Sequence, residues 1–375
     1  MTGAITSAFQ PIHEARGATF VEEGGWSWVD SYGDLDAEYR AVREGVGMWD
    51  LSPLNKWEVR GPEALEAVQR VHSNDVLSMA DGQVRYGAFL DENGLLVDDG
   101  TVFRFAKDRL WVMTNVMERE DYFADATKGL DVSVRYLGTD LPSLQVQGPG
   151  SRRVIERVLG DQVDLDALGY FRFVPEPVVV GGAPVTLSRT GFSGELGYEL
   201  FLAPEHAVQV WEAVEAEGAV PYGVGIIEPV RVEVGMIVTG YDYEEHERTP
   251  FDLGLDRVVA LDAPGAFMGK EILGEVAADP PNRFKTIRLD GDVLPAYGAA
   301  LTRDGEPVGV LTSPATSPRL GAIALAIVRS DVARDGERVE VALGEGMVGG
   351  TVDVLALYDP TKQRPRTRTR REDAR

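Results

Sequence analysis

Two periods of apolar spacing alternate along the chain and predict interleaved helices and strands. Residues 36–45 repeat their apolar positions with helical spacing. Alternation with a period of two predicts strands over residues 48–51, 56–60, 110–113, 132–136 and 143–147. Beyond residue 280, short alternating runs are separated by Asp-Gly and Glu-Gly turns, which is typical of a small β-barrel or sandwich. The expected fold class is therefore α+β with a β-rich C-terminal domain.

A strand, a Gly-Pro turn and a helix follow one another twice. The two segments are WEVRGPEALEAVQRV (57–71) and LQVQGPGSRRVIERV (144–158). Proline suits the first turn of a helix, because its missing N–H would have no partner there. The recurrence is consistent with two related α+β halves, and Asp279-Pro280-Pro281-Asn282 would link them to the C-terminal domain.

Composition narrows the classes of function. A length of 375 residues suggests two to three domains, and a net charge of −24 argues against nucleic acid or an anionic membrane as the main partner. No apolar run approaches the ~18 residues that a membrane span needs. The chain has no cysteine and no recognisable secretion signal, which favours a cytoplasmic location. Four histidines in no spaced motif make a metal centre unexpected.

Two adjacent acids, Asp98 and Asp99, follow an apolar run after the turn residues 91–94. Consecutive side chains of a strand point to opposite faces, so only one of the two can face a given pocket. The simpler interpretation is a hairpin that leaves both acids at an exposed strand end. The alternative is a functional carboxylate with its neighbour on the far side.

Two further polar clusters stand in apolar surroundings, while nucleotide-binding loops, nucleophile elbows and zinc motifs are missing from the sequence. Residues 188–200, SRTGFSGELGYEL, combine glycines with charges and rings such as Arg189, Phe192 and Glu199. That mixture suits a flat polar heterocycle, but also a glycine-rich hairpin. Residues 114–121, TNVMERED, are the other cluster, and Thr114 or Asn115 could simply cap a helix there.

Taken in order, several segments resemble the glycine-cleavage T-protein (aminomethyltransferase) family of tetrahydrofolate-dependent one-carbon transferases. They include VREGVGMWDLSPLNKWEVRGPEA, SNDV, YGAFLDENGLLVDDGTVFR, SRTGFSGELGYEL, GYDYEEHERTPFDLGL and FMGKEIL. The likeness runs from about Gly24 to Val354, which is nearly the whole chain.

The resemblance implies a three-domain cloverleaf around a central folate channel. The implied parts are residues 1–51 with 141–243, residues 52–140 with 244–280, the barrel-like 281–360, and a basic tail over 361–375 that we expect to be disordered. Tetrahydrofolate is the implied cofactor. The resemblance implies that Asp99 lies beside the reacting carbon, Glu199 on the pterin ring, and Tyr86 and Asn115 in the cofactor site. Arg189, Phe192 and Arg231 are further candidates for binding the cofactor.

One departure from the family changes the expected substrate. In GVGIIEPVRVE (223–233), Ile227 and Glu228 replace an arginine and an aspartate of the family pattern. Losing a guanidinium favours a less polar small-molecule methyl donor, and hence a methyltransferase or demethylase acting on a methoxy compound. Tyr241, Tyr243 and His246 are candidate proton donors to the leaving group.

Three alternatives stay open. They are the aminomethyltransferase reaction of glycine cleavage, demethylation of a sulfonium, and folate binding without catalysis. The non-catalytic branch of the family typically carries a cysteine-containing KGCYxGQE motif, which a chain without cysteine lacks.

Overall fold

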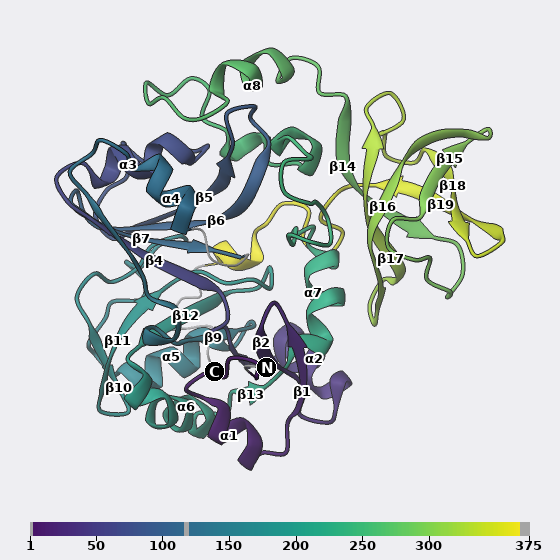
Figure 1. Cartoon of the computed structure of the whole chain (residues 1–375). Coiled ribbons are helices and arrows are strands. Elements are labelled where there is room, and N and C mark those ends of the chain that lie inside the picture. Colours follow the sequence, from purple (N-terminus) through teal and green to yellow (C-terminus); the bar gives the residue numbers. More distant parts are fainter. Residues whose placement is uncertain (1–2, 116–119, 368–375) are drawn as a thin grey trace.

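Three bodies of β-structure organise the protein (Figure 1). The computed structural model describes residues 3–115 and 120–367; residues 1–2, 116–119 and 368–375 lie outside the described part. The three bodies are a six-stranded sheet, a five-stranded sheet and a closed six-stranded barrel, preceded by a hairpin of β1 (Thr19–Glu23) and β2 (Trp26–Ser31). Within the described ranges, no helix has the length and apolar content needed to cross a membrane. The α+β prediction is confirmed, and the C-terminal domain is a barrel.

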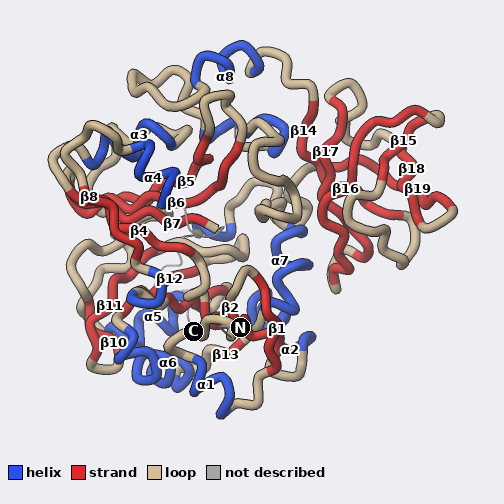
Figure 2. The backbone as a smooth tube through the Cα atoms, viewed as in Figure 1, coloured by secondary structure: helices blue, strands red, loops and turns tan. Residues whose placement is uncertain are grey.

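The six-stranded sheet runs in the order β10-β11-β12-β9-β3-β13. Its strands are β3 (Gly47–Asp50), β9 (Ser143–Gln147), β10 (Val178–Val180), β11 (Ala183–Ser188), β12 (Gly197–Leu202) and β13 (Val220–Pro221). Helices α1 (Gln10–Ala15), α5 (Ser151–Leu159) and α6 (Ala207–Ala216) lie below it in Figure 2. Alternate strand residues such as Val146 and Leu200 pack with Trp211 of α6 in one apolar core. The intervening residues point to the face without these helices.

The five-stranded sheet runs in the order β5-β6-β7-β4-β8. Its strands are β4 (Asn55–Arg60), β5 (Gln83–Leu90), β6 (Leu96–Ala106), β7 (Arg109–Thr114) and β8 (Ser133–Tyr136). Helices α3 (Ala64–Val71) and α4 (Glu120–Ala126) cover one face, where Trp57 and Phe89 pack against Phe123. On the other face, the rings of Phe103 and Trp111 contact Phe201 of the six-stranded sheet, with centroids 5.5 and 5.8 Å apart. The faces of the two sheets that lack helices therefore meet.

The two predicted Gly-Pro turns occupy equivalent places in the two sheets, between β4 and α3 and between β9 and α5. Gly61 and Gly148 have φ values of +136° and +123°, which side chains rarely adopt. A Cβ atom at Gly61 would lie 2.2 Å from the Asp131 carbonyl oxygen, and one at Gly148 would lie 2.6 Å from that of Gly45. Both turns thus need glycine because neighbouring backbone approaches closely.

The edge of β6 changes partner beside the two acids. Strand β7 pairs with β6 only as far as Gly100 opposite Thr114. Beyond that point another segment takes its place, since His246 N donates to Leu96 O and Leu96 N donates to Arg248 O, both at 2.8 Å. The loop before this segment is thereby held against Asp98 and Asp99.

Besides the two sheets, the fold contains the barrel and the helices α2 (Leu35–Glu44), α7 (Ile227–Glu233) and α8 (Lys270–Val276). The barrel closes in the order β14-β17-β16-β15-β18-β19. Its strands are β14 (Asn282–Leu289), β15 (Ala300–Arg303), β16 (Glu306–Ser317), β17 (Gly321–Arg329), β18 (Arg338–Leu343) and β19 (Gly346–Asp353). Helix α8 precedes it. Helices α2 and α7 lie between the six-stranded sheet and the barrel (Figure 1), and Arg43 of α2 donates to Glu233 of α7 at 2.8 Å.

The prediction that the C-terminal tail is disordered is wrong for residues 361–367. Residues 361–367 include a short 3₁₀ helix, Arg364–Arg366, that returns from the barrel toward the sheets (yellow in Figure 1). Arg364 donates to buried Glu195 at 2.8 Å, and Arg189 donates to the carbonyl of Thr367 at 2.7 Å. The segment is ordered because its arginine and carbonyl groups find buried partners. Residues 368–375 lie outside the described part.

Candidate active site

Asp99 is buried and accepts hydrogen bonds from two phenols. Tyr86 Oη donates to its Oδ2 at 2.8 Å, and Tyr243 Oη donates to its Oδ1 at 2.7 Å. Only 4% of the Asp99 surface is exposed, so the predicted exposed strand end is wrong. Burial raises the pKa of Asp99, and the negative charge of Asp242 adds to the rise, whereas the bonds from Tyr243, Tyr86 and Asn115 oppose it. The result is a fixed carboxylate with an increased affinity for a proton.

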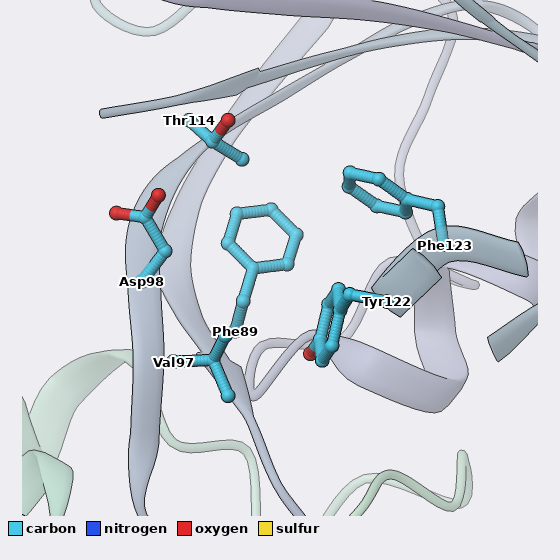
Figure 3. Close-up of a pocket in the computed structure, with 6 residues that line it drawn as sticks. All are labelled: Phe89, Val97, Asp98, Thr114, Tyr122 and Phe123. Atoms are coloured by element: carbon cyan, nitrogen blue, oxygen red, sulfur yellow. The ribbon is translucent and has the colours of Figure 1, made fainter. Parts of the chain in front are cut away.

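Asp98 points to the opposite face of β6, as strand alternation predicts. Figure 3 shows it with Thr114 on one side of a pocket whose other side is formed by the rings of Phe89, Tyr122 and Phe123. The pocket has no room for a water molecule. This pocket therefore has no space for a ligand beside Asp98.

Asn115 holds both acids in place. Its Nδ2 donates to the Asp99 carbonyl at 2.7 Å and to Asp98 Oδ1 at 3.2 Å, while its backbone N–H donates to Asp98 Oδ2 at 3.1 Å. Asp98 thus accepts hydrogen bonds from Asn115, and it also accepts one from the backbone N–H of Asp99 at 2.8 Å. The predicted helix cap falls partly outside the described residues, because α4 begins at Glu120 and residues 116–119 precede it.

A second polar row crosses the six-stranded sheet on its helix-free face. Glu199 of β12 stands opposite Gln145 of β9, which stands opposite Trp49 of β3. Gln145 Nε2 donates to Glu199 Oε1 at 2.9 Å, and the hydroxyl of Thr190 donates to Oε2. Burial raises the pKa of Glu199, and these two bonds and the charge of Lys56 oppose the rise. Residues 188–200 do form a hairpin, of β11 and β12, and it carries this carboxylate.

Several buried polar atoms near this row have unused hydrogen-bonding capacity. Among the described residues, Gln145 Oε1, Trp49 Nε1 and Tyr222 Oη have no hydrogen-bond partner. The Trp49 and Tyr222 rings lie 5.8 Å apart, and half-buried Phe192 packs against the same apolar cluster. Buried polar groups are normally satisfied, so an acceptor and two donors left over indicate a place for a polar ligand. A flat heterocycle that presents both N–H groups and acceptors fits these atoms.

Two predicted cofactor-binding arginines are committed elsewhere. Arg189 Nη1 donates to Leu168 O at 2.9 Å, and its Nη2 binds the C-terminal segment described above. Arg231 uses all five of its N–H groups: two on Glu228, and one each on Asp242, the Met236 carbonyl and the Ser313 hydroxyl. Arg231 therefore joins α7 to the barrel, because Ser313 belongs to strand β16. Arg231 has no N–H group left for a ligand, which argues against the expectation that it binds the cofactor, and the same expectation for Arg189 stays a prediction.

Of the three candidate proton donors, only Tyr243 contacts Asp99. Tyr241 is 39% exposed and donates to Glu23 at 2.8 Å. His246 is exposed, with φ at +61°, and its Nδ1 lies 2.8 Å from Asp91 Oδ2 at the β5–β6 turn. Tyr241 and His246 thus have partners away from the Asp99 cluster. Tyr243 also lines a cavity of about 130 Å³ between its loop and barrel strand β16.

Lys56, Gln145 and Thr239 belong to the polar clusters around Asp99 and Glu199 but were not among the residues predicted from the sequence. Lys56 is 1% exposed, and its Nζ donates to the carbonyls of Ser52 and Leu54 at 2.9 and 2.8 Å. Lys56 stands in step with the polar Glu58 and Arg60 in the alternating segment NKWEVR, so the pattern gave no signal that it is buried. Gln145 and Thr239 left no signal either, because their roles depend on neighbours from distant segments.

The chain has relatives among known proteins. The GCVT N-terminal domain family model matches residues 9–263, and the glycine cleavage T-protein C-terminal barrel domain model matches residues 282–359. The aminomethyltransferase of Halothermothrix orenii is 32% identical, with 91% of this chain and 96% of that protein covered. The trimethylamine-oxide aldolase of Ruegeria pomeroyi is 35% identical, with 93% of this chain but 46% of that protein covered.

A solved structure shares the whole architecture. The crystal structure of the glycine cleavage system aminomethyltransferase T from Bartonella henselae has a TM-score of 0.85 at 22% identity, covering 95% of this chain and 98% of that one. The fold is therefore the three-part cloverleaf of that protein. The chain belongs to the glycine-cleavage T-protein family, whose members are folate-dependent enzymes.

Proposed function

We propose that the protein is a tetrahydrofolate-dependent aminomethyltransferase with Asp99 beside the reacting atoms. The observation that carries this is the buried Asp99 carboxylate, held by two phenols on the open side of its sheet. The named relatives support the aminomethyl reaction, since aminomethyltransferases from several organisms match over nearly the full length of both chains.

The polar row of the six-stranded sheet would hold the pterin end of tetrahydrofolate. Glu199 and the free Gln145 Oε1 would accept from ring N–H groups, and Trp49 Nε1 and Tyr222 Oη would donate to ring acceptors. Phe192 would pack on the ring. Glu199 is the strongest acceptor of this set, because hydrogen bonds to a charged group are worth more than neutral ones.

Asp99 would stabilise charge and donate a proton beside the reacting carbon. Tetrahydrofolate supplies the ring nitrogens that take up the one-carbon unit. In its ionised form Asp99 would stabilise the positive charge that develops on the reacting nitrogen, and burial strengthens that attraction. In its protonated form it would donate to a departing amine. The raised pKa brings both forms closer to working pH.

Methyl transfer is a second candidate function, and Ile227 favours it. Ile227 begins α7 and packs beside the cluster of Trp49 and Tyr222. Arg231 does not replace the missing guanidinium, since its five N–H groups are occupied. A small methoxy or methylated donor would cost little desolvation near such a surface. The pocket of about 130 Å³ beside Tyr243 would admit a small donor group.

The folate product separates the two candidates. The protein would be incubated with tetrahydrofolate and either aminomethylated lipoyl carrier protein or aromatic methoxy compounds, and the folates identified by mass spectrometry. We expect 5,10-methylenetetrahydrofolate and ammonia from the lipoyl carrier. Formation of 5-methyltetrahydrofolate from a methoxy donor alone would establish methyl transfer in its place. An absence of tetrahydrofolate binding by calorimetry would overturn both.

A further inference from the structure

A chain of hydroxyl groups connects the two neighbouring acids around the edge of β6. Tyr243 Oη lies 2.7 Å from Asp99 Oδ1, Thr239 Oγ1 lies 2.7 Å from Tyr243 Oη, and Thr239 Oγ1 lies 3.3 Å from Asp98 Oδ1. The side chains of Asp98 and Asp99 point to opposite faces, so the strand itself keeps them apart. The loop that replaces β7 at this edge joins them.

The number of hydroxyl protons decides in which direction the hydrogen bonds of Tyr243 and Thr239 point. Tyr243 and Thr239 each carry one hydroxyl proton. If Asp99 is ionised, Tyr243 donates to it and Thr239 donates to Tyr243. The single hydroxyl proton of Thr239 is then not available to Asp98. The 3.3 Å separation from Asp98 is longer than an ordinary O–H···O hydrogen bond and agrees with this direction.

The opposite direction is available when Asp99 is protonated. Its proton then points to Tyr243 Oη, and the hydroxyls of Tyr243 and Thr239 rotate so that Thr239 donates to Asp98 Oδ1. No covalent bond of either hydroxyl breaks, and the only proton gained is the one on Asp99. Three N–H groups already donate to Asp98: those of Asp99 and Asn115 in the backbone, and Asn115 Nδ2. They stabilise a negative charge on Asp98, so the reversed chain ends on a charged acceptor.

We propose that Tyr243 and Thr239 form a two-state hydroxyl relay that reverses when Asp99 takes up a proton, and that Thr239 is a positioning residue for that proton. The proposal rests on the proposed function only in assigning Asp99 to the reacting centre. The other groups facing Asp99 are Tyr86 from β5, Asn115 after β7, and Asp242 from the loop, whose charge Arg231 offsets at 2.7 Å. None of them connects Asp99 to Asp98 through rotating hydroxyls.

The relay predicts in which direction the titration midpoint of Asp99 moves when the Thr239 hydroxyl is removed. In the ionised state that hydroxyl makes a neutral bond to Tyr243, and in the protonated state it makes a stronger, charge-assisted bond to Asp98. Removing it therefore penalises the protonated state more. The titration midpoint of Asp99 should fall by about one pH unit in Thr239→Val. Thr239→Ser keeps the hydroxyl and should titrate as the unmodified protein does.

Carbon-13 NMR of the unliganded full chain, labelled at aspartate carboxyls, tests this directly. Asp98→Asn and Asp99→Asn assign the two signals. In the unmodified protein and in Thr239→Ser, the chemical shift of the Asp98 carboxyl should change at the titration midpoint of Asp99. The reason is that Thr239 donates a hydrogen bond to Asp98 only when Asp99 is protonated. In Thr239→Val that response should disappear and the midpoint should fall. An unchanged or higher midpoint with a folded spectrum would overturn the relay. Tetrahydrofolate binding, measured separately by calorimetry, reports on the proposed function and is independent of this result.

Discussion

Replacing Lys56 by methionine should stabilise the protein more at pH 7 than at pH 9. Lys56 is fully buried between the two sheets, and burial lowers its pKa to about 7, although the charges of Asp50 and Glu199 oppose the change. The unfolded chain would hold this proton up to its ordinary pKa of 10.5. Between these two values the unfolded state binds more protons, so stability rises with pH. The destabilising contribution of Lys56 to the free energy of unfolding is therefore greatest below pH 7 and disappears above pH 10.5.

The magnitude follows from the same two pKa values. Their difference corresponds to about 5 kcal/mol at low pH, of which about 4 remains at pH 7 and about 2 at pH 9. Lys56→Met removes the titrating group and also its two bonds to the Ser52 and Leu54 carbonyls, a cost that does not vary with pH. The stability difference between variant and parent should consequently shift by about 2 kcal/mol between pH 7 and pH 9.

Urea unfolding of both proteins at the two pH values measures this shift, since all other titrating groups cancel in the difference. Lys107→Met is the matched control, because it removes a lysine from an exposed turn. Its difference from the parent should stay constant over the same range. A constant difference for Lys56→Met as well would show that the buried amine carries no proton penalty, and would refute the argument.

Three further predictions address the carboxylates and the barrel. Glu199→Ala should weaken tetrahydrofolate binding by about 1–3 kcal/mol through loss of a charged acceptor, and calorimetry showing no change would remove Glu199 from the site. Asp99→Asn should lower turnover at least ~100-fold, whereas Asp98→Asn should mainly lower the unfolding temperature; equal kinetic losses would contradict the assignment of faces. Arg231→Met should cost about 3–5 kcal/mol in urea unfolding, because Asp242 is left buried and unpaired, and Arg231→Met with Asp242→Asn should recover part of it.

Local patterns predicted the elements of this fold well. The strand at residues 143–147, the helix at 36–45 and both Gly-Pro turns were predictable because each depends on alternation, spacing or a backbone angle within a few residues. The closure of the C-terminal strands into a barrel could not be separated from a sandwich, since both use the same short alternating runs.

The site was predictable only where its residues lie in a recognisable motif. Asp99, Tyr86 and Asn115 come together as the family resemblance implied, and the role of each remains a prediction. The internal partners of Arg189 and Arg231 were not predictable, because a sequence shows a charge but not its partners. Their partners, the Thr367 carbonyl and Asp242, come from segments that only the folded chain brings near.

The order of strands in the six-stranded sheet has a consequence for synthesis on the ribosome. Strand β3, at residues 47–50, lies between β9 and β13, and β13 ends at Pro221, about 170 residues later. At ~5–20 residues per second, β3 waits roughly 10–30 s for its last neighbour. The five-stranded sheet, contained within residues 55–136, is complete well before that. The nascent chain thus exposes the apolar Met48 and Trp49 while a finished sheet already stands beside them, which makes residues 47–50 a natural binding segment for chaperones.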